Sequence, residues 1–314
     1  MRASVRSLLT GAIDYAGLFP PARLPLDEAF ATFLEHRREP AGWLIGRFVC
    51  PAARLGELTD LAAGIDEMEA PIVVSVLGTG GDEPEDLLTA VASDAAAIGR
   101  ATTAEPERLL VDQYEARMPG ACPAERLPEI LQSARERLEG ASPTGLMTFF
   151  ETPLLGGWRA SLSPAVTAVA SAGSGLKIRC GGLDGSAIPG AAAVAAALAA
   201  SARLGVPLKA TQGLHHPLRH FDRTLETTAH GFLNLLIAGV LARSRRLDEE
   251  TFLELVEEED LARYRFTDDG LAWRDFEADL EEIASARQHV VTTFGSCSFT
   301  EPRDDLVARG LLDG

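Results

Sequence analysis

Short β-rich runs alternate with Ala- and Leu-rich runs along almost the whole chain, and this alternation limits the possible folds more than any other feature. Strands are predicted at residues 11–16, 43–50, 71–78, 108–115, 145–151, 175–180, 206–211 and 289–295. Helices are predicted at residues 26–36, 83–97, 123–138, 189–204, 227–243 and 302–309. Such alternation is typical of parallel βα units. Eight of these units in 314 residues predict an α/β fold, the (β/α)8 barrel.

The barrel accounts for the chain as one domain, residues 1–314, with a helical insertion at 244–288 before the last strand. Within the insertion we predict an acidic helix at 248–260, a turn at the sequence TDDG, and a second acidic helix ending near residue 287. An open, doubly wound sheet is the alternative. It is disfavoured because no G-x-G-x-x-G motif follows the first strand.

Net charge excludes some classes of partner. A charge of −17 and a pI near 4.8 disfavour binding to nucleic acids and to anionic membranes. The four cysteines form no C-x-x-C pair, which indicates reduced thiols in a cytoplasmic protein rather than a zinc ribbon or a disulfide framework. No signal peptide is predicted, and the apolar run GFLNLLIAGVLA is too short to span a bilayer. We predict no cofactor, a small anionic substrate and a possible homo-oligomer.

Two consecutive strands each carry a lysine near their C-terminal end, in the sequences GLKIRCGG and PLKATQG. Strand alternation places Lys177 and Arg179 on one face of the sixth strand, and Lys209 and Thr211 on the same face of the seventh. These side chains are predicted to point into the barrel, where catalytic groups sit at strand ends. Crowded, desolvated ammonium groups favour the neutral form, so at least one lysine is expected to have a lowered pKa and to form Schiff bases.

This pattern resembles class I aldolases of the deoxyribose-phosphate aldolase type, which are (β/α)8 barrels. In that family a sixth-strand lysine forms the Schiff base, and here Lys177 resembles it. Lys209 resembles the seventh-strand lysine that lowers its pKa, and FGSCSF at 294–299 resembles the phosphate-binding loop. The resemblance also implies an acid on the fourth strand, for which Asp112 is the nearest candidate and Glu115 the second. It covers three short segments, and the residues following both lysines depart from the family pattern.

Several polar residues are predicted to bind the anionic substrate around these lysines. The predicted set is Arg179, Asp14, Glu151, Gly295, Ser296 and Ser298. The backbone N–H groups and hydroxyls of the last loop suit a phosphate or carboxylate. Alternatively, both lysines form inert ion pairs with Glu151, Asp112 or Asp14.

Three of the six histidines lie in GLHHPLRHFD, residues 213–222. Pro217 is predicted to start a helical turn, which leaves His215 and His216 in the loop and His220 one turn on. His215 or His216, with Asp112, is predicted to move protons. The alternative is a divalent-metal site formed by His215, His216 and His220.

Three further features have mainly structural interpretations. His230 and Asn234 are four residues apart on a predicted helix and are expected to form a satisfied buried pair. The stiff segment DYAGLFPPA, residues 14–22, is expected to wall a pocket. Cys297 is a candidate nucleophile, but the sequence places no histidine base beside it.

Together these observations predict an enzyme, a carbon–carbon lyase that acts on a small anionic carbonyl compound through a lysine Schiff base. A metal-dependent hydrolase or lyase that uses the histidine cluster is the second hypothesis. A non-catalytic barrel that binds a small molecule is the third.

Overall fold

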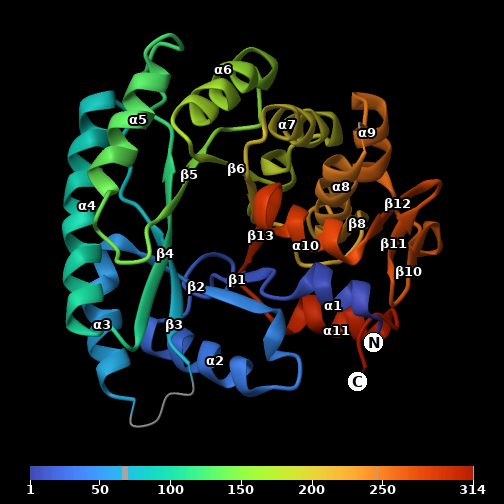
Figure 1. Ribbon diagram of the computed structural model, residues 1–314, viewed down its shortest axis with the longest axis horizontal. Helices are drawn as coiled ribbons and strands as arrows, with labels where there is room; N and C mark the ends of the chain where they lie inside the picture. Colours follow the sequence, from blue (N-terminus) through green and yellow to red (C-terminus); the bar gives the residue numbers. More distant parts are fainter. Residues whose placement is uncertain (66–69, 246, 314) are drawn as a thin grey trace.

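Eight parallel strands close into a barrel in the computed structural model, which describes residues 1–65, 70–245 and 247–313 (Figure 1). The barrel strands are β1 (Ile13–Tyr15), β2 (Ile45–Pro51), β3 (Ile72–Leu77), β4 (Leu109–Arg117), β5 (Met147–Glu151), β6 (Gly175–Arg179), β7 (Leu208–Thr211) and β13 (Val291–Ser296). Their order around the barrel is β1-β13-β7-β6-β5-β4-β3-β2. Each coincides with a predicted strand, so the predicted barrel is confirmed and the open sheet is wrong.

Helices surround the barrel and connect its strands. They are α1 (Ala3–Leu9), α2 (Leu26–Arg38), α3 (Leu55–Ala63), α4 (Pro84–Ala104), α5 (Leu127–Leu138), α6 (Trp158–Ser171), α7 (Ala191–Leu204), α8 (Phe232–Ser244), α9 (Glu249–Glu257), α10 (Leu280–His289) and α11 (Thr300–Ala308). Short 3-10 turns cover Gly42–Leu44, Ala52–Arg54, Gly185–Ala187 and Leu261–Arg263. The six helices predicted around the strands are all present, the last of them after the final strand. Proline in the first turn of α4 and of α5 helps to start both helices, because its fixed φ suits that position.

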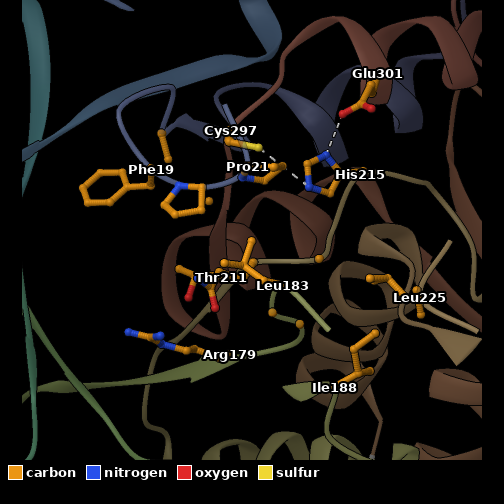
Figure 2. A pocket seen from close by; sticks show the side chains of 18 of the residues that line it. Phe19, Pro21, Arg179, Leu183, Ile188, Thr211, His215, Leu225, Cys297 and Glu301 are labelled. Carbon is orange, nitrogen blue, oxygen red and sulfur yellow. Dashed lines mark hydrogen bonds and ion pairs between the residues drawn. The ribbon is translucent and has the colours of Figure 1, made fainter. Parts of the chain in front are cut away.

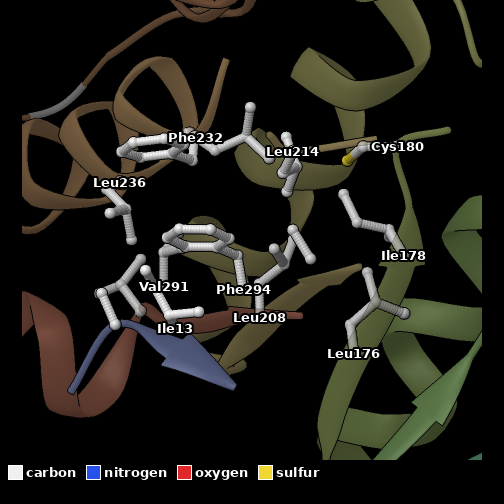
Figure 3. Close-up of a cluster of buried hydrophobic side chains, with 14 of the residues drawn as sticks. Ile13, Leu176, Ile178, Cys180, Leu208, Leu214, Phe232, Leu236, Val291 and Phe294 are labelled. Carbon is white, nitrogen blue, oxygen red and sulfur yellow. The ribbon is translucent and has the colours of Figure 1, made fainter. Parts of the chain in front are cut away.

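Strand alternation sorts the core into an outer and an inner layer. Leu176, Ile178 and Leu208 are fully buried between the barrel and its helices (Figure 3). Phe232 at the start of α8 stacks on Phe294 of β13, with ring centroids 4.7 Å apart. Because these apolar residues face outward, their neighbours along the same strands face the barrel interior.

One helical segment, Gly185–Leu204, is long and apolar enough by length and composition to cross a membrane. Its α7 part packs against α6, α8, α9 and strand β6. Val194, Ala197 and Leu198 are buried in those contacts. The apolar composition of this segment therefore serves helix packing around the barrel.

The insertion before the last strand differs from the predicted pair of helices. After α9 the chain forms a three-stranded antiparallel sheet of β10 (Tyr264–Phe266), β11 (Gly270–Trp273) and β12 (Phe276–Asp279), and only then α10. The sheet packs against α8 and α10 and lies at the right of Figure 1. The predicted turn at TDDG is confirmed, because it connects β10 to β11. The predicted second helix is wrong over 271–279, where the chain forms β11 and β12, and α10 covers the rest of it. Residue 246 of the predicted insertion lies outside the described residues.

A second small hairpin follows β7. It consists of β8 (His220–Asp222) and β9 (Thr227–Ala229), which pair antiparallel. The helical turn predicted after Pro217 is wrong, since the chain is extended by His220. The predicted helix that begins at residue 227 instead begins at Phe232 as α8, and the hairpin before it borders the mouth of the barrel.

Candidate functional site

A cavity of about 730 Å³ opens at the C-terminal ends of the barrel strands. Its size is ordinary for a small-molecule site. Loops that follow β1, β6, β7 and β13 form its walls (Figure 2). Phe19, Pro20 and Pro21 line it, so the predicted role of the 14–22 segment as a pocket wall matches the structure.

The floor of the cavity is built by three neighbouring strands. Glu151 of β5 pairs in register with Lys177 of β6, which pairs in register with Lys209 of β7. Register partners in adjacent strands project to the same side of a sheet. The three side chains therefore point together into the barrel, as predicted for the two lysines.

Lys209 is completely buried below the cavity and is surrounded by oxygen atoms. Its Nζ contacts the carboxylate of Asp14 and lies 2.5 Å from Oε1 of Glu115. It also donates to Oε1 of Gln113 at 2.9 Å and to Oγ of Ser75 at 3.3 Å. Contacts with these four acceptors fix the Lys209 side chain within the barrel interior.

Lys177 lies closer to the opening and is 5% exposed. Its Nζ is 2.8 Å from Oε2 of Glu115 and 3.2 Å from Oε2 of Glu151. Burial alone would lower the pKa of Lys177, but the charges and hydrogen bonds of these two carboxylates outweigh it and raise the pKa above its usual value. Burial alone would raise the pKa of Glu115, but the two lysines hold it well below its usual range.

The predicted lowering of a lysine pKa by its neighbouring lysine is therefore wrong for Lys177. The prediction counted only the positive charges that alternation brings together. In the structure Glu115 lies between the two ammonium groups and contacts both. The effect of the Glu115 carboxylate on the pKa of Lys177, at hydrogen-bond distance, outweighs the effect of the more distant Lys209 amine.

Asp112 does not occupy the position predicted for the fourth-strand acid. The β3–β4 register skips it, so that Val74 pairs with Val111 and Ser75 with Gln113. Such a bulge turns two consecutive side chains the same way. Asp112 accepts two hydrogen bonds of 2.6 Å from Arg47, a bidentate pair that occupies both oxygens.

Glu115, the second candidate for that acid, is the one that contacts the lysines. Of the three partners predicted for inert ion pairs, Glu151 and Asp14 do contact Lys177 and Lys209 respectively. Asp112 pairs with Arg47 instead. Carboxylates and lysine amines therefore alternate along one chain of contacts inside the barrel, from Asp14 through Lys209, Glu115 and Lys177 to Glu151.

The predicted anion-binding residues are only partly brought together. Arg179 lines the cavity, and its Nε lies 2.7 Å from Oε1 of Glu151. Gly295 also lines it. In contrast, the Ser296 hydroxyl donates to the backbone oxygen of Ser298 at 2.6 Å, and Oγ of Ser298 accepts from a backbone N–H at the start of α11. The serine hydroxyls hold the loop together, whereas Arg179 lines the cavity.

All three histidines of the 213–222 segment line the cavity, each with a partner on Nδ1. His215 pairs with Glu301 at 2.7 Å and His216 with Asp305 at 3.0 Å. Nδ1–H of His220 donates to the Leu218 backbone oxygen at 3.0 Å. Within residues 1–65, 70–245 and 247–313, no three His, Cys, Asp or Glu side chains gather as a set able to hold a metal ion. The alternative metal site has no support in this geometry.

Sequence reasoning missed the base beside Cys297. Nε2 of His215 lies 3.9 Å from Sγ of Cys297. The signal was present, because the seventh and eighth strands of a barrel are neighbours and the loops after them must meet. Gly295 shows how closely these two segments approach, since a Cβ on Gly295 of β13 would lie 3.2 Å from Cγ2 of Thr211 at the end of β7.

A second missed signal is compositional. Lys177 and Lys209 are the only lysines in the chain, while arginine supplies the other 27 basic residues. Arginine stays protonated and suits inert ion pairs, whereas lysine can lose its proton and act as a nucleophile. Both lysines lie in the barrel interior beneath one cavity, which favours chemistry over a merely structural pairing.

The side chain of Asn234 holds the histidine segment, residues 213–222, in place. His230 precedes α8 rather than sharing its face, so the predicted pair is not formed on a helix. Asn234 is fully buried and donates to the backbone oxygens of Leu255 and Glu258, both at 2.8 Å. Its Oδ1 accepts from the backbone N–H of Arg219 at 2.9 Å. One amide thus joins the histidine segment to the end of α9.

Replacing Asn234 by leucine is expected to lower the free energy of unfolding by about 1–3 kcal/mol, because buried backbone groups lose their partners. Urea unfolding measures the change. Gln132→Leu removes an exposed amide on α5 and serves as the control, with an expected effect within about 0.5 kcal/mol. Equal effects of the two variants would contradict the bridging role of Asn234.

Comparison with solved structures finds the same architecture in an aldolase. QR15, an aldolase, superposes with a TM-score of 0.51 over 98% of this chain and 99% of that chain, at 10% sequence identity. No family model and no curated protein matches the sequence. The chain therefore has an aldolase-like barrel, and at this identity the likeness concerns the fold.

Proposed function

We propose that the protein is an aldolase-like carbon–carbon lyase that binds a small anionic carbonyl compound as a Schiff base on Lys177. The observation that carries the proposal is the position of Lys177, whose amine lies at the floor of the cavity between two carboxylates. The aldolase-like barrel supports the same class of reaction. Lysine amines form Schiff bases with carbonyl carbons.

Lys177 is the better nucleophile of the two lysines. It retains some exposure, and its neighbours leave it open to the cavity. Lys209 has no exposed surface, and four oxygen atoms surround its amine. We assign Lys209 to holding Glu115 in place and charged.

Glu115 and Glu151 are placed to move the protons of this step. The Lys177 ammonium gives a proton to a carboxylate, and the free amine attacks the carbonyl carbon while the carbonyl π electrons move to oxygen. The protonated carboxyl group returns its proton to that oxygen, which forms a carbinolamine. A second proton then passes from the nitrogen of the adduct through a carboxylate to the same oxygen, the carbon–oxygen bond breaks, water leaves and the protonated imine remains. Both carboxylates lie within 3.2 Å of the amine, which is within reach for such transfers.

Arg179 supplies the positive charge that an anionic substrate needs. It lies at the edge of the cavity, and about half of its side chain is exposed. Glu151 holds its guanidinium from one side and leaves other N–H donors for a ligand. Because the whole chain carries a charge of −17, this local cation is important for attracting an anion.

Borohydride trapping tests the proposal directly. Pyruvate, dihydroxyacetone phosphate and glyceraldehyde 3-phosphate are each incubated with the protein and reduced, and peptide mass spectrometry locates the adduct. Only the amines of Lys177 and Lys209 and the N-terminal amine can form a reducible imine with these compounds. We expect an adduct on Lys177 with at least one of these compounds.

Lys177→Arg is the matched control, because it keeps the charge between Glu115 and Glu151 but cannot form an imine. It is expected to abolish trapping while circular dichroism stays unchanged. An adduct on Lys209, or no adduct on Lys177 with any of the three compounds, would overturn the assignment.

A further inference from the structure

A second reactive group lies at the mouth of the same cavity. His215 follows β7, Cys297 follows β13 directly, and Glu301 lies in the first turn of α11. Sγ of Cys297 is 3.9 Å from Nε2 of His215, and Nδ1 of His215 is 2.7 Å from Oε2 of Glu301 (Figure 2). Gly295 pairs in register with Thr211, which brings the two loops together. The imidazole of His215 therefore contacts the thiol of Cys297 through one ring nitrogen and the carboxylate of Glu301 through the other.

The hydrogen bonds around His215 assign its role. Since the carboxylate of Glu301 accepts a hydrogen bond from the Nδ1–H group, Nε2 is left as the acceptor that faces the thiol. This is the order of nucleophile, base and orienting acid that activates a thiol. Burial raises the pKa of Cys297, so the thiol is protonated at rest and needs such a base when it attacks.

The other cysteines lack this setting. Cys50 and Cys180 are fully buried, and burial raises the pKa of each to about 12. Cys122 lies between β4 and α5 and is partly exposed. Cys297 is the cysteine among the cavity-lining residues, and it carries the histidine contact. Cys122 thus provides an internal reference for an accessible thiol.

We propose that Cys297, with His215 as base and Glu301 as positioning residue, binds a small aldehyde as a hemithioacetal. The choice of an aldehyde rests on the proposed function, because an aldol reaction has two carbonyl partners and Lys177 holds one of them. Apolar side chains of Phe19, Leu183 and Ile188 line the cavity and suit a short carbon chain (Figure 2).

The step is balanced without an oxidant or a cofactor. The thiol proton of Cys297 moves to Nε2 of His215, and the sulfur attacks the aldehyde carbon. A carbon–sulfur bond forms, the carbonyl π bond breaks, and its electrons pass to the oxygen. The imidazolium then returns the proton to that oxygen, which leaves a neutral hemithioacetal. Reversal of the same steps releases the aldehyde.

Site-resolved alkylation tests the activated thiol without reference to Lys177. Iodoacetamide is added at neutral pH, and peptide mass spectrometry follows Cys297 and Cys122 separately. His215→Asn is expected to slow alkylation of Cys297 by about tenfold or more and to leave Cys122 unchanged. Glu301→Gln keeps an acceptor for Nδ1 and is expected to retain more of the rate than Glu301→Ala. A Cys297 rate that His215→Asn does not change overturns the proposal.

Protection by glyceraldehyde tests the ligand, and glycerol is the control that lacks a carbonyl group. The experiment uses the Lys177→Arg variant, so that imine formation on Lys177 plays no part. Glyceraldehyde is expected to slow alkylation of Cys297 more strongly than that of Cys122, and glycerol to change neither. Equal slowing of both thiols would contradict an aldehyde site at Cys297. Since the borohydride experiment reports on Lys177 alone, failure of either proposal is recognised separately.

Discussion

Lys209→Met is expected to lower the free energy of unfolding by about 3–5 kcal/mol, because it leaves buried carboxylates without their shared cation. Asp14 and Glu115 are both buried and both contact the Lys209 amine. Methionine has a similar length and is apolar, so the change reports mainly on charge and hydrogen bonding. Urea unfolding followed by circular dichroism gives the difference from the unmodified protein.

An exposed ion pair of similar contact distance provides the control. Arg265 lies 2.5 Å from Glu277 on the small sheet of the insertion, and both side chains are largely exposed. Arg265→Met is expected to cost at most about 1 kcal/mol. The double variant Lys209→Met with Asp14→Asn should lose less than the sum of the two single variants, because both changes remove the same interaction. If the losses of unfolding free energy in the two single variants add up in the double variant, Lys209 and Asp14 do not stabilise the fold through their contact. A loss in Lys209→Met no larger than in Arg265→Met would contradict the prediction in the same way.

The barrel could be predicted from the sequence because its strands are short, buried and separated by helices of ordinary length. The inward direction of Lys177 and Lys209 followed from alternation alone, since their apolar neighbours had to face the helices. The sheet in the insertion could not be predicted in this way. Its strands are three or four residues long, and acidic residues around them masked the alternation.

The chemistry of the site was harder to predict, because it depends on contacts between distant residues. Because of the bulge at Asp112, Glu115 rather than Asp112 contacts the two lysines, and no local pattern in the fourth strand predicts a bulge. The same limit applies to the lysine pKa, which depends on Glu115 and Glu151 reaching between strands. In contrast, the contact between the loops of His215 and Cys297 followed in principle from the order of strands in a closed barrel.

Glu115→Gln is expected to move the pH dependence of Schiff-base trapping to lower pH by about one unit or more. The free amine is the reactive form, so in the unmodified protein trapping should speed up as the pH rises toward the raised pKa of Lys177. Removing the carboxylate 2.8 Å from Nζ lowers that pKa, and the rise then begins at lower pH. The maximal rate is expected to fall by about 10²-fold or more, because a proton-transfer group is lost.

Two further variants separate this effect from a general loss of charge inside the barrel. Glu151→Gln removes the second carboxylate, 3.2 Å from Nζ of Lys177, and should move the profile in the same direction. Asp112→Asn also removes a fourth-strand acid, but Arg47 binds that carboxylate, so the profile should keep its position. Circular dichroism first establishes that each variant is folded. A shift in Asp112→Asn as large as in Glu115→Gln would mean that Lys177 responds to the total charge of the barrel interior rather than to the carboxylates that contact it.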